Sequence, residues 1–120
     1  MRPHEKLDVW KKAVDFVVAV YKATERWPKE ERFGLVAQVR RAAVSVPANI
    51  SEGAARTSNR EFAYFLSNAQ GYASEVETEL IIAHRLGYLS DSEIQELSAS
   101  HDDIGKMLIG LIRKVRSKIG

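Results

Sequence analysis

The sequence contains no cysteine, which excludes a disulfide framework and any thiolate metal site. Proline is also scarce, with single residues at positions 3, 28 and 47. The longest uncharged run near the N-terminus covers residues 16–21, far short of the roughly 20 residues of a membrane-spanning helix. The first twelve residues carry charges throughout, unlike the apolar core of a signal peptide. We therefore expect a cytoplasmic protein with no membrane partner.

What the sequence does contain is enough apolar material for one packed core, because hydrophobic residues make up 45% of its 120 positions. The charges are unevenly distributed. Residues 1–61 carry 12 basic and 8 acidic side chains, residues 62–112 carry 2 and 8, and residues 113–120 carry four basic ones and no acidic one. This pattern predicts separate positive and negative faces. Either complementary helix faces or a site for a polyanion would explain them.

Four segments place apolar residues at helical spacing, and none shows the strict alternation of a strand. The expected helices cover residues 7–26, 28–53, 58–87 and 90–115. Pro28 is expected to open the second helix. Ser58 with Glu61, and Ser90 with Glu93, have the spacing of capping boxes. Amphipathic helices with short connections predict one all-α domain over residues 1–120, an antiparallel up-down four-helix bundle.

Pro47 falls inside the second expected helix. It has no N–H to donate to the carbonyl of Ala43, so we expect a kink at this position. Asn49 is placed to donate to the carbonyl that the proline frees, and Glu52 to hold an arginine. Gly53 is a suitable stop. We interpret Pro47, Asn49, Glu52 and Gly53 as a structural motif.

The first and third helices carry more apolar residues than one core face needs, which is roughly three in seven. Residues 7–24 contain 12 apolar side chains among 18 positions. We assign the core stripe of the first helix to Trp10, Val14, Val17, Tyr21 and Thr24. The surplus predicts contacts between copies of the chain, with Val9, Phe16, Tyr64, Tyr72 and Ile82 as interface candidates. A wide core with a few exposed alanines and tyrosines is the alternative.

Eight basic residues are candidates for contact with nucleic-acid phosphates: Arg40, Arg41, Arg56, Arg60, Arg113, Lys114, Arg116 and Lys118. Pairing with Glu52 or with glutamates of a neighbouring helix would equally explain the first four. The last four suit the negative end of a helix dipole. The sequence displays no base-reading motif and no aromatic stacking platform.

The sequence offers little sign of catalysis or of a metal site. Neither His84 nor His101 follows a glutamate by three residues, as the di-iron sites of helix bundles require. The Gly-x-Ser-x-Gly nucleophile elbow is absent. We interpret His101, on the seam of the last helix, as a core or rim residue bonded to a neighbour. We expect no catalytic residues, no metal and no cofactor.

Residues 38–53 form a distinctive block, QVRRAAVSVPANISEG, in which two arginines precede a mid-helix proline and an Asn-x-x-Glu-Gly sequence. Ser58, Glu61-Phe62, Phe65-Leu66 and residues 86–89 continue the pattern. The block resembles the family of four-helix-bundle proteins encoded in intervening sequences of bacterial large-subunit ribosomal RNA genes. It is also similar to the accessory variability proteins of diversity-generating retroelements. The resemblance covers nearly the whole chain.

The resemblance implies a ring of bundles, typically a pentamer with a central channel, and no known catalytic activity. Its retroelement branch implies a basic surface that binds nucleic acid and a reverse-transcriptase partner. We therefore expect a non-enzymatic, homo-oligomeric scaffold or adaptor that binds RNA, DNA or a nucleic-acid enzyme. One alternative is a DNA-binding regulator that uses the second and third helices as a helix-turn-helix. The other is a scaffold that binds only proteins.

Overall fold

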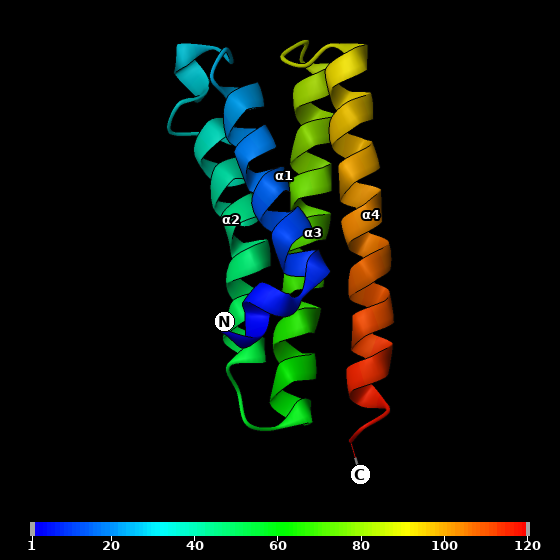
Figure 1. Cartoon of the computed structure of the whole chain (residues 1–120). Helices are drawn as coiled ribbons and strands as arrows, with labels where there is room; N and C mark the ends of the chain where they lie inside the picture. The colour runs from blue at the N-terminus through cyan, green and yellow to red at the C-terminus, as the bar shows by residue number, and fades with distance from the viewer. Residues whose placement is uncertain (1, 120) are drawn as a thin grey trace.

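The computed structural model describes residues 2–119, with every side chain in that range except that of Lys6. Its four α-helices are α1 (Asp8–Thr24), α2 (Leu35–Ala54), α3 (Asn59–Arg85) and α4 (Asp91–Arg116). Two short 3-10 helices, η1 (Pro3–Lys6) and η2 (Lys29–Glu31), precede α1 and α2. No strand occurs within residues 2–119. Successive helices run in opposite directions (Figure 1), and the all-α, four-helix prediction is confirmed.

Each helix packs against two others, so that the four form a square. α1 contacts α2 and α4, and α3 contacts α2 and α4, whereas the backbones of the diagonal pairs do not approach closely anywhere in the described chain. All four helices contribute to one hydrophobic core, and its largest fully buried side chains are Val20, Val39, Ile50, Leu66, Val76 and Leu108. Burial of this shared apolar surface is the main force that holds the helices together. No helix in the part described is long and apolar enough to cross a membrane.

The predicted caps of α3 and α4 form, with one difference. The Ser90 hydroxyl accepts from the Glu93 N–H at 3.1 Å, and the Glu93 carboxylate accepts from the Ser90 N–H at 2.9 Å, completing the box. The Ser58 hydroxyl likewise accepts from the Glu61 N–H at 3.1 Å. The Glu61 carboxylate, however, accepts from that hydroxyl and not from the Ser58 backbone. The start of α3 therefore has a simple N-cap.

Gly87 ends α3 as predicted. Its φ of +83° lies in the left-handed region, where a glycine has no Cβ penalty. The N–H groups of Gly87 and Tyr88 donate to the carbonyls of His84 and Ala83 at 3.0 and 2.9 Å. These two bonds satisfy carbonyls that the end of the helix would otherwise leave unpaired. The connection to α4 can therefore turn within a few residues.

The core face of α1 differs from the prediction. Its buried residues are Val9, Ala13, Phe16, Val20 and Thr24, so the interface assignment of Val9 and Phe16 is wrong. Both side chains are 4% exposed and belong to the core. Of the predicted stripe, only Thr24 is buried, and Tyr21 is 40% exposed. Both lines of residues are apolar and helically spaced, so the sequence pattern fits either face.

The start of α2 also differs from the prediction. Pro28 opens the 3-10 helix η2, and α2 begins only at Leu35. Gly34 separates the two and lies at φ −103° and ψ −111°, outside helical geometry. The Glu31 carboxylate accepts from the Leu35 N–H at 3.2 Å. It thereby caps α2 in place of a residue at the usual N-cap position.

The motif around Pro47 is only partly as predicted. Pro47 is buried inside α2, and the helix continues on both sides of it; the kink stays a prediction. Asn49 does not serve the carbonyl of Ala43, because its side-chain amide donates to the Ser45 carbonyl at 2.7 Å. That carbonyl lies one turn back, within easy reach of a short polar side chain. Glu52 does hold an arginine, Arg56.

Gly53 does not end α2, which continues to Ala54. Gly53 instead permits close packing of α2 on α3. A Cβ at this position would lie 2.8 Å from Phe65 Cβ and 3.0 Å from Phe62 Cδ1. Gly53 thus acts through its lack of a side chain.

Replacing Gly53 with alanine is expected to destabilise the protein by about 1–3 kcal/mol, since α3 must shift to admit the methyl group. Gly110→Ala is a matched control in α4, because a Cβ there meets nothing within 4 Å. It is expected to stabilise the protein by about 0.5–1 kcal/mol through helix propensity alone. Urea unfolding of the two variants measures both effects. A Gly53→Ala protein as stable as the parent would show that the packing is looser than described.

Candidate nucleic-acid interface

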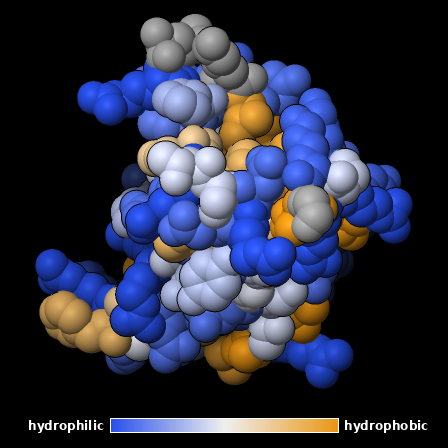
Figure 2. All heavy atoms as spheres, turned by 90° about the horizontal axis from the view of Figure 1, so that it is seen from below, coloured by the Kyte–Doolittle hydropathy of each residue, from blue (hydrophilic) through white to orange (hydrophobic). Residues whose placement is uncertain are grey.

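The up-down order of the helices brings two separate groups of basic residues to one end of the bundle. The C-terminal ends of α2 and α4 and the N-terminal end of α3 all lie there, at the bottom of Figure 1. We call this surface the basic end. It carries six of the eight predicted phosphate-contact residues, all of them exposed: Arg56, Arg60, Arg113, Lys114, Arg116 and Lys118. Figure 2 looks onto this end and shows mainly hydrophilic side chains with hydrophobic areas between them.

Two of these cations have partners within the chain. Arg56 pairs with Glu52 one turn earlier, and its guanidinium lies over the Phe65 ring at 4.9 Å. Arg116 reaches the Ser67 hydroxyl at 3.4 Å, which ties the end of α4 to α3. The other four form no ion pair with any residue between positions 2 and 119. Their charges are therefore available to an external anion.

Aromatic side chains border the basic end, which the sequence pattern did not predict. Tyr64 is 63% exposed and meets Phe65 edge-to-face with ring centroids 5.3 Å apart. Exposed aromatic rings beside arginines are the surface on which unpaired bases stack. Residues 55–58 connect α2 to α3, so Arg56 and the first turns of α3, which carry Tyr64 and Phe65, must share one end of the bundle. The structure adds the cation–π contact of Arg56 with Phe65.

Arg40 lies away from the basic end and is occupied within the fold. Its Nε donates to the Thr24 hydroxyl at 2.8 Å, and its Nη2 donates to the Tyr21 carbonyl at 3.2 Å. The guanidinium also lies 4.4 Å from the centroid of the Tyr21 ring. Arg40 therefore has partners inside the fold, and its assignment as a phosphate contact stays a prediction. Its positive charge lies beside the last turn of α1, where the negative end of the helix dipole favours cations.

Arg41 is exposed on α2 but faces acidic residues of α3. It lies close enough to Glu79 to lower the pKa of that carboxyl. Burial of Glu79 and the nearby charge of Glu75 act in the opposite direction and prevail, raising the pKa of Glu79 to about 7. Arg41 is thus part of a mixed-charge region on α2 and α3 and is separate from the basic end.

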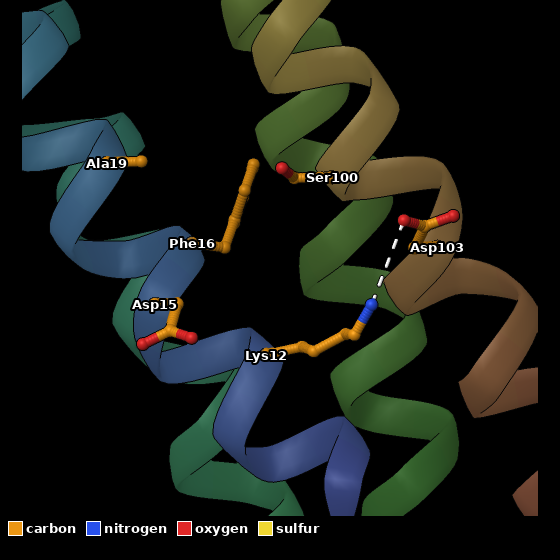
Figure 3. A pocket seen from close by; sticks show the side chains of 6 residues that line it. All are labelled: Lys12, Asp15, Phe16, Ala19, Ser100 and Asp103. Carbon is orange, nitrogen blue, oxygen red and sulfur yellow. Dashed lines mark ion pairs between the residues drawn. The ribbon is translucent and has the colours of Figure 1, made fainter.

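A groove lies between α1 and α4 on the surface (Figure 3). Lys12, Asp15 and Phe16 line it from α1, and Ser100 and Asp103 from α4. Phe16 points across it toward α4, while Lys12 Nζ and Asp103 form an ion pair at 3.9 Å. The ion pair spans the groove and joins the two helices. The side chains that line it include no histidine beside Ser100 that would make the serine a nucleophile.

The remaining interface candidates are exposed as predicted. Tyr72 and Ile82 are 39% and 44% exposed, and with Tyr64 they lie along α3. Ile81 is 44% exposed, and Leu86, at the C-cap of α3, is 55% exposed. Half of the large exposed hydrophobic side chains of the described chain therefore belong to α3 and its cap. A concentration of this kind is typical of surfaces that contact other proteins.

Residues 5–110 match the model of the family described as 23S rRNA-intervening sequence protein. The chain is also similar to a solved structure, a protein of unknown function from the S23 ribosomal protein family of Bacteroides thetaiotaomicron. The two share 27% sequence identity with a TM-score of 0.78, over 87% of this chain and 97% of that chain. A search of curated proteins gave no significant match.

Proposed function

We propose a function from the premise that this chain belongs to the 23S rRNA-intervening sequence protein family. In this proposal it is a non-enzymatic, self-associating scaffold that binds structured RNA through its basic end. The family match bears out the resemblance to proteins encoded in ribosomal RNA intervening sequences. The likeness to retroelement accessory proteins stays a prediction.

The convergence of six cations at one end of the bundle carries this proposal. Each lysine or arginine that neutralises a phosphate releases counterions, which supplies most of the affinity for a nucleic acid at low salt. The exposed ring of Tyr64, which packs edge-to-face on Phe65 beside Arg56, provides a surface for bases that are not stacked in a duplex. Phosphate contacts next to stacking rings favour RNA with loops or single-stranded segments over a uniform duplex.

The packing of α2 and α3 speaks against a helix-turn-helix regulator. The two helices of that motif meet at about 90–120°, and the second enters the major groove. Here α2 and α3 lie side by side along the bundle (Figure 1), and α3 is packed between α2 and α4. A long recognition helix would have to leave the core before it could enter a groove.

Self-association through α3 is the second part of the proposal. The row of exposed apolar side chains on α3 supports it, and we expect the pentameric ring that the family resemblance implies. In a ring with cyclic symmetry every basic end faces the same side. Weak contacts from each protomer would then combine, and the avidity of the ring for one RNA would exceed that of a single bundle.

Binding of a structured RNA and a duplex DNA of matched length, titrated with salt, tests the proposal. Four to six phosphate contacts predict a slope of log K against log salt of about −3 to −5 per protomer. Light scattering of the parent and of a Tyr72→Asp, Ile82→Asp double variant tests self-association, and we expect only the variant to be monomeric. No RNA binding at low salt would leave a scaffold for proteins, with a reverse transcriptase among the partners to test.

A further inference from the structure

His101 of α4 is held in one tautomer by the backbone of α3. Its Nε2 lies 2.7 Å from the Ala73 carbonyl oxygen, and the Phe16 ring packs edge-on against the imidazole at 6.1 Å between centroids. A carbonyl oxygen only accepts, so Nε2 must carry a hydrogen. In the neutral ring Nδ1 then presents its lone pair. Metal-binding histidines in proteins are oriented in this way, with the second ring nitrogen donating to a carbonyl or carboxylate.

The free nitrogen of this ring is buried and has no hydrogen-bond donor among the described residues. Two carboxylates face it instead. Glu77 Oε2 of α3 lies 3.8 Å from Nδ1, and Asp102 Oδ1 of α4 lies 3.9 Å away. All three ligand atoms lie within 4.8 Å of one another. The Nδ1 lone pair and the two carboxylates are all electron-rich and have no positive partner between them. This arrangement destabilises the folded chain unless a cation binds there.

We propose that His101 Nδ1, Glu77 and Asp102 bind a divalent transition-metal ion of the Zn²⁺ class. Bonds of about 2.1 Å to a tetrahedral ion separate its ligand atoms by about 3.4 Å. The nitrogen-to-oxygen distances here exceed that value by only a few tenths of an ångström. The carboxylates of Glu77 and Asp102 are 53% and 65% exposed, so both can rotate inward. The histidine, which must be fixed, is the least exposed member of the set, with its side chain 13% exposed.

The ligand types select the ion. One imidazole and two carboxylates suit Zn²⁺, Co²⁺ or Ni²⁺, whereas Ca²⁺ and Mg²⁺ prefer a shell of oxygen ligands alone. Three protein ligands leave one coordination position open to water or to an external oxygen. Since Glu77 comes from α3 and the other two ligands from α4, the ion would also join these helices near the middle of the bundle.

Co²⁺ and Zn²⁺ titrations of the full, metal-stripped chain test the proposal. We expect one ion per chain, a visible d–d absorption band with Co²⁺, and a rise in Tm with Zn²⁺ but not with Ca²⁺ or Mg²⁺. Glu77→Gln and Asp102→Asn should each weaken Co²⁺ binding at least tenfold, because each removes one of three ligands. Both residues are exposed, so neither change threatens folding. His101→Gln should abolish the band.

Two control variants remove similar groups elsewhere. His84→Ala deletes an imidazole that pairs with Asp91, and Asp103→Asn deletes the carboxylate next to Asp102 that pairs with Lys12. Both should bind Co²⁺ as the parent does. The competing arrangement is a protonated His101 whose Nδ1–H bonds to a carboxylate. Unchanged Co²⁺ affinity in the Glu77 and Asp102 variants, or a parent with no band and a protonated Nδ1 by nitrogen NMR, overturns the proposal.

Discussion

Replacing the four cations at the end of α4 with glutamine is expected to weaken binding to structured RNA by at least about 100-fold at low salt. The substitutions are Arg113, Lys114, Arg116 and Lys118, each to glutamine. If each contacts one phosphate, the slope of log K against log salt should become shallower by about 3–4. The contacts are electrostatic, so the loss should shrink as salt rises and should not depend on RNA sequence.

A control of equal charge makes this result specific. Lys22, Lys29, Arg32 and Arg85 are exposed. They belong to the end of α1, to η2 and the residue after it, and to the end of α3, and these segments lie at the opposite end of the bundle, at the top of Figure 1. Changing these four to glutamine gives the same net charge as the first variant. A fluorescently labelled RNA titrated at several salt concentrations compares the two. Equal losses of affinity in both variants would mean that net charge, and not the basic end, governs binding.

Replacing Glu79 with glutamine is expected to stabilise the protein at pH 8 and to have little effect near pH 4.5. Glu79 is 7% exposed, and its Oε1 lacks a hydrogen-bond partner in the described chain. Burial, with a smaller contribution from the charge of Glu75, raises the pKa of Glu79 from 4.5 to about 7. A pKa difference of one between the folded and unfolded chain corresponds to about 1.36 kcal/mol of stability, so the gain is at most about 3 kcal/mol.

The direction of the pH dependence follows from proton binding. Between pH 4.5 and 7 the folded chain holds a proton on Glu79 that the unfolded chain has released. Stability therefore falls as pH rises through this window, and the full cost is present above it. Glutamine is neutral at every pH, so Glu79→Gln removes this pH dependence of stability. Chemical unfolding between pH 4.5 and 8 measures the free energy of unfolding of both proteins, with Glu96→Gln, at an exposed position, as a control. If the free energy of unfolding changed with pH in the same way for the parent and for Glu79→Gln, Glu79 would be ionised in the folded chain across this pH range, and the prediction would be wrong.

Features set by local chemistry could be predicted from the sequence. The caps at Ser58 and Ser90 and the end of α3 at Gly87 depend only on neighbouring residues, and they are present. The face of α1 could not be predicted in the same way. Val9 and Phe16 form as regular a line as Trp10 and Val17, so only the positions of α2 and α4 decide which line is buried.

The candidate site shows the same division. Each of its cations could be identified from the sequence, and the predicted up-down order already places the C-terminal ends of α2 and α4 at the same end of the bundle. The sequence could not show which of these cations have partners inside the fold and which are available to an external anion. Arg40 finds its partner, Thr24, on another helix 16 positions away. The cluster of Glu77, His101 and Asp102 was missed for a similar reason, because its ligands come from two helices and do not follow the Glu-x-x-His spacing.

The unequal lengths of the helices have a consequence for local unfolding. α1 has 17 residues and α3 has 27, or about 25 and 40 Å at 1.5 Å per residue. α1 begins partway along the bundle (Figure 1), so only α2, α3 and α4 build the basic end. Segments with fewer packed neighbours open most readily. Backbone amides in the first turns of α3 and the last turns of α4 should therefore exchange with deuterium fastest, and a bound RNA should slow their exchange most.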